Sequence, residues 1–392
     1  MKFLDYIGLT KDLFEVYLTR RLVQVQHHPT FPLDIYFYGR EAVHSNHWDA
    51  VTTKCRGVIV NRETGDIVAR PFEKFFNFGD PNFGDPNFGM TEAAVAEKVR
   101  MCGEPVVWEK MDGFLCIGYK WDGKWYCASK GSFTSPHAKW ATSKIQEYKD
   151  IWPTGYTPVF EGITPNLRIV VDYGEQERLV LLAYVETETG AEYPPTCLRW
   201  YVDTPTLRSL CWDEAVDLSR DEDIKNVEGY VLTWYQNSGP PFRLKVKYID
   251  YLRIHRMVTG LSPKRILEAL QNGWTSELDE WSDDSTPWFN KFVTKWRRVI
   301  EVEAMRLECE AKRIYDDARE ENRVKVGQLP YENMGEERKA YAQVFNRPEN
   351  REFSGILFAM LDGKRWQDVI YKKIKTSGLL KNSGPMVDSH YV

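Results

Sequence analysis

The sequence predicts an α+β protein, with an antiparallel-sheet domain of residues 1–254 followed by an all-α domain of residues 255–392. Three observations support this. Short apolar runs typical of strands recur between about residues 31 and 250, and turn signals join some of them into hairpins. After about residue 252 the apolar residues recur at helical spacing instead. Because the inserts between the strand runs are variable, antiparallel sheets are favoured over a regular parallel sheet.

The strands are predicted in chain order from their composition and turns. "DIYFYG" (34–39) is a short aromatic strand. "RGVIVNRETGDIVAR" (56–70) and "LCIGYKWDGKWYCASK" (115–130) are hairpins, and the Asp-Gly pair of the second indicates a type I′ turn. Four more strands complete the prediction: "TPVFEGI" (157–163), "RLVLLAYVET" (178–187), "VEGYVLTWY" (227–235) and "FRLKVKYI" (242–249).

Helices are predicted after the last strand. The segment 286–321 places apolar residues on one helical face, namely Phe289, Phe292, Val293, Trp296, Val299 and Ile300. "EFSGILFAMLDG" (352–363) and "WQDVIYKKIK" (366–375) are also predicted to be helical. Earlier in the chain, the repeat "NFGDPNFGDPNFG" (77–89) is predicted to be a loop, because Gly-Asp-Pro interrupts regular structure. A tandem duplication at the surface is favoured over an aromatic loop above a nucleotide or RNA site.

Composition limits the function classes. The net charge is 52 − 57 = −5, so a nucleic-acid site would have to be a local basic groove. The seven cysteines are odd in number and form no CxxC pair, which disfavours a disulfide framework or zinc ribbon and favours a reducing compartment. The N-terminus lacks a signal-peptide core, and no apolar run approaches ~20 residues. We therefore expect a soluble cytoplasmic protein without a membrane partner.

The stretch "WEKMDGFLCIGYK" (108–120) combines a lysine, an aspartate and a glycine. The stretch is predicted to be a strand, so Lys110 and Asp112 share a face, and Gly113 permits close approach of a backbone or ligand. A lysine is a useful nucleophile only when deprotonated, and burial or nearby positive charge lowers its pKa. Alone, the four-residue pattern is weak, and a salt-bridged strand lysine is the simpler interpretation.

Two further patterns carry charge inside apolar strands. "FRLKVK" places Arg243, Lys245 and Lys247 on one face, an array that suits phosphate oxygens and would help lower the pKa of a nearby lysine. Glu161 and Glu228 each lie within an apolar run and precede a glycine. A buried carboxylate there needs a cation, a metal or a hydroxyl as its partner.

Each pattern is ambiguous alone, but the ordered set resembles the covalent nucleotidyltransferase superfamily of ATP-dependent ligases and capping enzymes, with an ATP-grasp-like ligase domain. Within it, the chain is most similar to the T4-type phage RNA ligase 1 family. The resemblance runs through "CRGVIV", "RPFEKFFN", "EKMDG", "SKGS", "FEGITPNLRIVV", "VLLAYVETETG", "NVEGYV" and "LKVK". It continues into "ERKAYAQ" and "GILFAMLDG", and so covers most of the chain.

The resemblance implies that Lys110 is the nucleophile that takes AMP from ATP. It implies that Lys245 and Lys247 grip the α-phosphate, and that Glu228, which precedes Gly229, activates the lysine or holds a divalent ion.

The same resemblance implies the rest of the nucleotide pocket. Asp112 and Gly113 would let the nucleotide lie close to the strand, and Glu161 would contact the ribose or act near the metal. The positions that would hold the triphosphate tail, the ribose or the pocket wall are Tyr38, Arg56, Lys74 and Lys130. Phe72, Phe75 and Phe76 are predicted to be core packing rather than pocket floor. Phe114 departs from the family, which usually has a serine there.

The implied reaction has three steps: formation of lysyl-AMP, transfer of AMP to an RNA 5′-phosphate, and sealing by a 3′-hydroxyl. ATP and Mg²⁺, or alternatively Mn²⁺, would be the cofactors. Single-stranded or nicked-loop RNA, including tRNA under repair, would be the partner of a monomeric enzyme. The helical domain would influence RNA specificity, and a bacteriophage origin would place the enzyme in the host cytoplasm.

Two alternatives remain at this point. A DNA ligase or a capping guanylyltransferase would usually append a β-barrel after the last lysine motif, whereas this sequence predicts helices there. A non-catalytic RNA-binding protein descended from a ligase would not need to keep every lysine and glutamate of the motifs.

Overall fold

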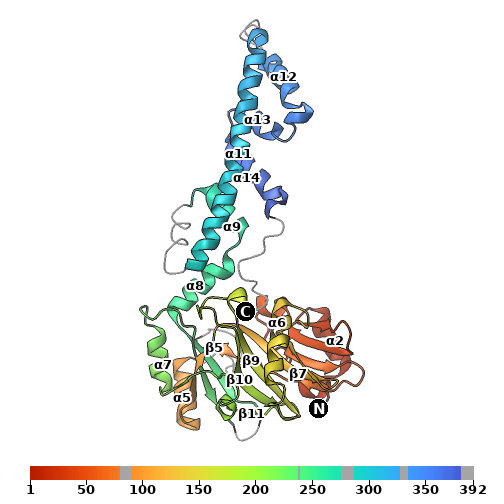
Figure 1. Cartoon of the computed structure of the whole chain (residues 1–392), viewed down its shortest axis with the longest axis vertical. Coiled ribbons are helices and arrows are strands. Elements are labelled where there is room, and N and C mark those ends of the chain that lie inside the picture. The colour runs from red at the N-terminus through yellow and green to blue at the C-terminus, as the bar shows by residue number, and fades with distance from the viewer. Residues whose placement is uncertain (80–90, 237–238, 275–286, 327–333, 381–392) are drawn as a thin grey trace. The chain divides into compact units, whose positions relative to one another are not determined.

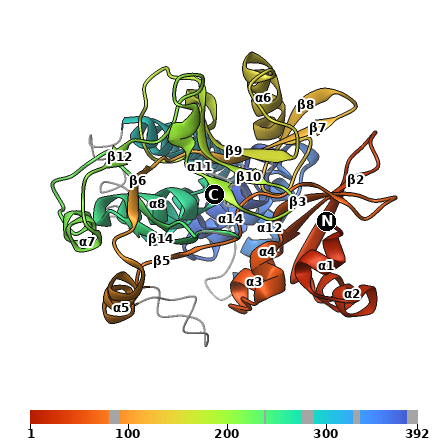
Figure 2. The ribbon, with the colours of Figure 1, turned by 90° about the horizontal axis from the view of Figure 1, so that it is seen from below.

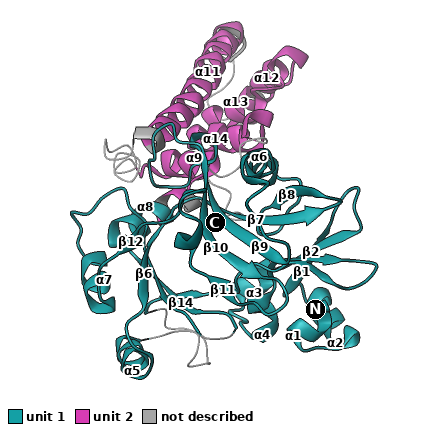
Figure 3. Ribbon diagram, turned by 60° about the horizontal axis from the view of Figure 1, so that its bottom comes forward, with its two compact units in different colours: residues 1–255, 389–392 teal, residues 256–388 magenta. Residues whose placement is uncertain are grey.

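The computed structural model describes residues 1–79, 91–236, 239–274, 287–326 and 334–380. The chain forms two compact units, one of residues 1–255 and a second that begins at Arg256 (Figure 3). The sequence placed this division one residue earlier. Among the described helices, none is both long and apolar enough to cross a membrane.

The first unit begins with a small sheet and four short helices. Its helices are α1 (Phe3–Ile7), α2 (Lys11–Thr19), α3 (Arg40–His44) and α4 (Ala50–Lys54). The sheet has the order β1-β2-β3-β4 and is antiparallel throughout, with strands β1 (Val23–His27), β2 (Leu33–Tyr38), β3 (Arg56–Asn61) and β4 (Ile67–Ala69). The strand at 34–39 and the hairpin at 56–70 are therefore confirmed.

A second antiparallel sheet has the order β11-β10-β9-β7-β8. Its strands are β7 (Phe114–Trp121), β8 (Lys124–Ala128), β9 (Tyr156–Ile163), β10 (Arg178–Glu186) and β11 (Glu192–Tyr193). Asp122 and Gly123 both have positive φ, at 47° and 75°, which confirms the predicted type I′ turn. Apolar residues of α6 (Pro136–Ile145) pack with this sheet, including Ala141 and Ile145.

The third sheet carries the charged strands, in the order β12-β6-β13-β14-β5. Its strands are β5 (Phe76–Asn77), β6 (Val106–Lys110), β12 (Leu207–Arg208), β13 (Gly229–Trp234) and β14 (Phe242–Lys247). All pairs are antiparallel except β14 with β5. Helices α5 (Glu92–Cys102) and α7 (Trp212–Ser219) belong to the same unit, and Figure 2 shows the three sheets from below.

The stretch from Trp108 to Lys120 is not one strand. β6 ends at Lys110 and pairs within the third sheet, whereas β7 begins at Phe114 and pairs within the second. Met111 and Asp112 lie in the connection. The prediction of a single strand was therefore wrong, because alternation along the sequence cannot reveal that the chain changes sheets between two strands.

The second unit is helical in its described part (Figure 1). α8 (Ile249–Gly260) crosses the division between the units, and the helices that follow are α9 (Pro263–Asn272), α11 (Pro287–Val326), α12 (Met334–Phe345), α13 (Ser354–Leu361) and α14 (Trp366–Thr376). The helices predicted in 286–321, 352–363 and 366–375 are thus confirmed. Val293 and Ile300 are fully buried, as the apolar stripe predicted. The NFGDP repeat lies outside the described residues from residue 80 onward.

Candidate active site

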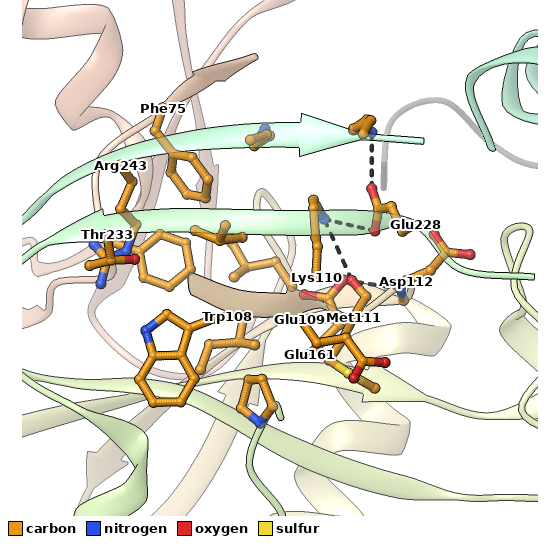
Figure 4. Close-up of a pocket in the computed structure, with 18 of the residues that line it drawn as sticks. Phe75, Trp108, Glu109, Lys110, Met111, Asp112, Glu161, Glu228, Thr233 and Arg243 are labelled. Atoms are coloured by element: carbon orange, nitrogen blue, oxygen red, sulfur yellow. Dashed lines mark hydrogen bonds and ion pairs between the residues drawn. The ribbon is translucent and has the colours of Figure 1, made fainter. Parts of the chain in front are cut away.

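A cavity of about 150 Å³ lies in the first unit and brings the motif residues together (Figure 4). Eleven of the twelve predicted site residues line it: Tyr38, Arg56, Lys74, Lys110, Asp112, Gly113, Lys130, Glu161, Glu228, Lys245 and Lys247. Gly229 does not line the cavity, but it lies opposite both Lys110 and Lys247 in the strand register. Segments almost 210 residues apart in sequence therefore form one site.

Glu228 is the charge centre of this site. One carboxylate oxygen accepts a hydrogen bond from the Lys110 ammonium at 2.8 Å, and the other accepts one from Lys247 at 2.9 Å. The Glu228 side chain is only 4% exposed. Burial would raise the pKa of Glu228, but the two lysines outweigh it and hold that pKa below its ordinary value. The carboxylate is thus ionised and shared between two cations.

The pKa of Lys110 is raised, contrary to the expectation from the cationic array. Burial lowers it, but the carboxylates of Glu228, Glu161 and Asp112 together have the larger, opposite effect. The sequence showed the cations of "FRLKVK" but not how closely Glu228 approaches. Lys110 is therefore an ammonium in this structure, and it must lose a proton before it can act as a nucleophile.

Lys245 differs from its neighbours because it has no carboxylate partner within the described residues. Burial lowers its pKa well below the ordinary lysine value, and the nearby cations of Lys74, Lys110, Arg56 and Lys247 lower it further. By contrast, Arg243 on the same strand forms a buried ion pair with Glu192. Lys245 thus lies in a strongly positive environment that an anionic group would neutralise.

A second group of cations surrounds Tyr38 at the end of β2. The ammonium of Lys130 lies 4.8 Å from the centre of the phenol ring, and that of Lys74 lies 5.6 Å from it. Burial favours the neutral phenol, but Lys130, Lys74 and Arg56 outweigh burial and lower the pKa of Tyr38 to about 8. The guanidinium of Arg56 has a buried nitrogen without a hydrogen-bond partner in the described residues. These groups suit the oxygens of a polyphosphate.

Asp112 connects three parts of the chain rather than pairing directly with Lys110. One carboxylate oxygen accepts hydrogen bonds from the backbone amides of Val170 and Val171, at 2.8 and 2.6 Å. The other accepts one from the Tyr251 hydroxyl at 2.8 Å. The Tyr173 hydroxyl accepts one from the Asp112 amide at 2.9 Å. Burial raises the pKa of Asp112 to about 6, and these donors oppose the rise. The carboxylate therefore fixes the connection that follows the nucleophile.

Two glycines are required by backbone packing. A Cβ at Gly113 would lie 2.3 Å from the Gly162 carbonyl oxygen, so the close approach at this position is to β9. Gly229 has φ +150°, and a Cβ there would lie 2.0 Å from the Val246 carbonyl oxygen. Both glycines let neighbouring strands approach beside Glu161 and Glu228.

Glu161 is the second carboxylate of the site. One of its oxygens accepts a hydrogen bond from the Gly113 amide at 3.0 Å. Burial raises its pKa to about 7, while Lys110 opposes this and the carboxylates of Glu228 and Asp112 reinforce it. No group of three or more candidate metal ligands is found within the described residues. A divalent ion would therefore need phosphate or water ligands in addition to Glu161 or Glu228.

The aromatic residues of the motif "RPFEKFF" divide between two roles. Phe72 belongs to the apolar core and also lines the cavity, where the Arg56 guanidinium lies 4.9 Å from its ring centre. Phe75 likewise lines the cavity, 4.8 Å from the Lys245 ammonium. Phe76 is buried in β5 and is not part of the lining. Even so, the Lys74 ammonium lies 4.6 Å from the ring centre of Phe76, so the core-packing prediction does not describe any of the three residues completely.

Several residues of this site were not predicted from the sequence. Tyr251 follows Lys247 by four positions, at the start of the helix after β14, and only the fold shows that it reaches Asp112. Trp108 and Thr233 were quoted as strand residues, yet both line the cavity on the same sheet face as Lys110. Alternation with Lys110 along "WEK" could have identified Trp108.

Comparison with known proteins agrees with this site. The RNA ligase family profile of the T4 type matches residues 54–251, just over half of the 392-residue chain. The chain belongs to the T4-type RNA ligase family. The matched segment includes every residue discussed above from Arg56 to Tyr251, and among the predicted site residues it omits only Tyr38.

Individual relatives of this RNA ligase family member are distant. RNA ligase 1 of bacteriophage TS2126 is 29% identical over 194 residues, which are 45% of this chain and 47% of that one. A Thermovibrio ammonificans relative is 28% identical over 219 residues, 53% of this chain and 54% of its own. The chain thus spans about half the length of these curated relatives. The RNA ligase of Rhodothermus phage RM378 is 23% identical over 79% of this chain and 81% of its own.

Among solved structures, an archaeal ATP-dependent RNA ligase aligns with 95% of this chain and 80% of its own, at 12% identity and a TM-score of 0.43. A Naegleria gruberi RNA ligase with pyrophosphate aligns with 42% of this chain and 55% of its own, at 16% identity and a TM-score of 0.32. These scores are too low to add to the family match.

Proposed function

We propose that this chain is an ATP-dependent RNA ligase that joins 5′-phosphate and 3′-hydroxyl RNA ends through lysyl-AMP and adenylated RNA. The observation that carries the proposal is the placement of Lys110. It ends β6 with its ammonium on Glu228, and Lys245 and Lys247 face the same cavity from β14. This arrangement lies within the segment that matches the RNA ligase family.

The first step follows from the charges of these residues. The Lys110 nitrogen, after losing a proton, forms a bond to the α-phosphorus of ATP, and the bond from that phosphorus to pyrophosphate breaks. Glu228 already accepts a hydrogen bond from Lys110 and is placed to take the proton. Lys245 and Lys247 stabilise the charge that develops on the phosphate oxygens, without having to reorganise.

The later steps use the same cations. AMP passes from Lys110 to the 5′-phosphate of RNA, and a 3′-hydroxyl then displaces AMP to form the phosphodiester. Tyr38, Arg56, Lys74 and Lys130 would hold the pyrophosphate portion of ATP in the first step. The unpartnered buried nitrogen of Arg56 supports this assignment, because a buried donor normally has an acceptor.

A divalent ion fits the site when phosphate is present. Mg²⁺ usually keeps water and phosphate ligands and takes one or two carboxylates from a protein, and Glu161 and Glu228 provide two. Mn²⁺ would fit the same oxygen ligands. When bound, the ion would neutralise phosphate charge, while Lys110 and Glu228 would still handle the proton.

The direct test is to incubate the protein with α-³²P-ATP and Mg²⁺ without RNA and to look for label on the denatured protein. We expect acid-labile, alkali-stable label on the wild type and none on Lys110→Ala. Lys120→Ala, which removes an exposed lysine of β7, should remain labelled. Label from GTP but not ATP would favour a capping-type enzyme. No label on protein free of bound AMP would favour a non-catalytic RNA-binding protein.

The helical unit is proposed to influence the choice of RNA, with broken tRNA loops as one substrate, for a monomeric enzyme in the cytoplasm of a phage host. In support, α14 presents exposed Lys372 and Lys375 although the whole chain is acidic. Lys375 is paired with Glu268, which leaves Lys372 as the simpler site to change. Lys372→Glu should weaken sealing of a cleaved anticodon stem-loop more than sealing of a linear oligonucleotide.

A further inference from the structure

Two buried polar atoms, each on a residue that lines the cavity, have no hydrogen-bond partner within the described residues. They are the indole nitrogen of Trp108 and the hydroxyl of Thr233. Trp108 is 6% exposed and Thr233 is 1% exposed, and both line the cavity that contains Lys110. Because buried polar groups are normally paired, two such atoms on residues that line one cavity leave hydrogen bonds that a bound ligand could supply.

The neighbours of Trp108 do not supply a partner for it. The Tyr235 phenol is close enough to interact with the indole: burial raises the pKa of Tyr235 to about 12, while Arg243 and Trp108 oppose the rise. The geometry between indole and phenol is nevertheless not that of a hydrogen bond. An indole N–H can only donate, whereas the threonine hydroxyl can donate or accept. Together, the Trp108 indole and the Thr233 hydroxyl can therefore form hydrogen bonds with an acceptor and a neighbouring donor of one ligand.

The sheet register places these atoms relative to the nucleophile. Lys110 lies opposite Gly229, Trp108 opposite Val231, and Thr233 is two residues further along β13. At about 3.3 Å per residue, Trp108 is displaced by about 7 Å and Thr233 by about 13 Å along the strands from Lys110. These separations are on the scale of the distance from the α-phosphate to the base of a nucleotide.

Part of the cavity wall between these two atoms and Lys110 is apolar, and Lys245 lies opposite Val231 on the same sheet face. Val231 lies beside Trp108 on the same sheet face, and Leu182 of β10 and Pro205 also line the cavity. Apolar walls with a few polar groups are typical of a pocket for a flat ring, since the walls cover the faces and the polar groups contact the edge. Figure 4 shows Trp108 and Thr233 toward one side of the cavity and Glu228 and Asp112 toward the other.

We propose that Trp108 and Thr233 select the base of the nucleotide. The Trp108 indole donates to a ring nitrogen of adenine, and the Thr233 hydroxyl accepts from the 6-amino group. This inference rests on the proposed function, because it assumes that the nucleotide binds with its α-phosphate at Lys110. It makes Thr233 the residue that distinguishes adenine from a purine without the amino group.

The test measures binding rather than catalysis. ATP and purine riboside triphosphate, which lacks the 6-amino group, are titrated calorimetrically into Lys110→Ala protein and into the same protein with Thr233→Val. We expect the first protein to prefer ATP by about tenfold and the Thr233→Val protein to lose that preference. Lys110→Ala protein that carries Trp108→Phe in place of Thr233→Val should bind both ligands more weakly by a similar factor, because both ligands have the ring nitrogen.

Controls separate the possible failures. Thr233→Ser keeps the hydroxyl and should keep the preference. Thr142→Val removes a hydroxyl that bonds to Cys127 in the protein and should leave nucleotide binding unchanged. Without nucleotide, Thr233→Val should not lower the Tm, because the hydroxyl it removes has no partner.

An unchanged ATP preference in a folded Thr233→Val protein would overturn the assignment of Thr233. An unchanged affinity in Trp108→Phe would overturn that of Trp108. If the wild-type protein also failed to form lysyl-AMP with any nucleotide, the proposed function itself would fail, which is a different result from either of these.

Discussion

Charged residues are used in opposite ways in the two units. In the first, Lys110, Glu228 and Lys247 are nearly buried, and Lys110 lies 118 positions from Glu228 in sequence. In the second, α11 carries exposed pairs three or four residues apart, such as Arg313 with Glu310 and Asp317. A buried pair is costly to disrupt, whereas an exposed pair contributes little. The comparison teaches that only the first kind of pair can hold a reactive group in a defined charge state.

The largest effect is expected from Glu228→Gln. It leaves Lys110 and Lys247 buried without their shared carboxylate, which should lower the free energy of unfolding by about 3–5 kcal/mol. The rate of Lys110 labelling should fall at least ~100-fold, because the group placed to take the proton is lost. Urea unfolding and α-³²P-ATP labelling measure the two effects.

Adding Lys247→Met to Glu228→Gln removes one of the two unpaired cations. The double variant should recover part of the stability but none of the labelling rate. Normal stability and labelling in Glu228→Gln would show that the buried group of Lys110, Glu228 and Lys247 is no more important than a surface pair.

The next largest effect concerns Tyr38, whose pKa of about 8 lies below the ordinary value of 10.0. A phenol with a depressed pKa contributes stability that is fully present above pH 10 and is lost as the pH falls through about 8. Two pKa units correspond to at most about 2.7 kcal/mol. Tyr38→Phe should therefore remove a rise in stability between pH 8 and 10.

The Tyr38 phenolate can also be observed directly. Ultraviolet absorbance should detect one phenol that titrates near pH 8 in the wild type and is absent in Tyr38→Phe. Tyr36 on the same strand is the matched control, since burial raises its pKa to about 12, and Tyr36→Phe should leave that early titration unchanged. Identical titrations in all three proteins would contradict the cation cluster around Tyr38.

Lys245→Met should stabilise the protein while impairing function. At neutral pH the folded state must either hold a buried, uncompensated cation or release its proton, so replacement by methionine should add on the order of 1–2 kcal/mol. Labelling by ATP should nevertheless fall, because the phosphate loses a cation.

The pH dependence of this variant has a definite sign. The folded-state pKa of Lys245 is depressed, so the unfolded state binds more protons, and wild-type stability rises with pH up to about 10.5. Lys245→Met should lack this contribution. Lys247→Met is the control that should not gain stability, because Lys247 is paired with Glu228. A loss of stability in Lys245→Met would mean that Lys245 has an anionic partner.

The smallest effect is expected on α11. Arg313→Ala breaks two exposed pairs with Glu310 and Asp317, and its Tm should stay within about 2 °C of the wild type. Lys110 labelling should be unchanged. A large drop in Tm would remove the distinction between the two kinds of charge pair.

The sequence alone predicted most of the elements and many of the residues that line the cavity. Alternation and turn residues identified the hairpins at 56–70 and 115–130, because these signals are local. The helical stripe that contains Val293 and Ile300 was equally local. The ordered motifs identified eleven residues that line one cavity, because such motifs keep chemically required residue types in a fixed order.

Only the tertiary structure decided the electrostatics of that cavity. The sequence suggested a lowered pKa for Lys110, but its pairing with Glu228, 118 positions away, raises it. It also could not show that the chain changes sheets between Lys110 and Phe114, or that Thr233 is left without a partner. The physical reason is the same in each case: pKa values and hydrogen bonds depend on distances between segments that are remote in the chain, and only folding sets those distances.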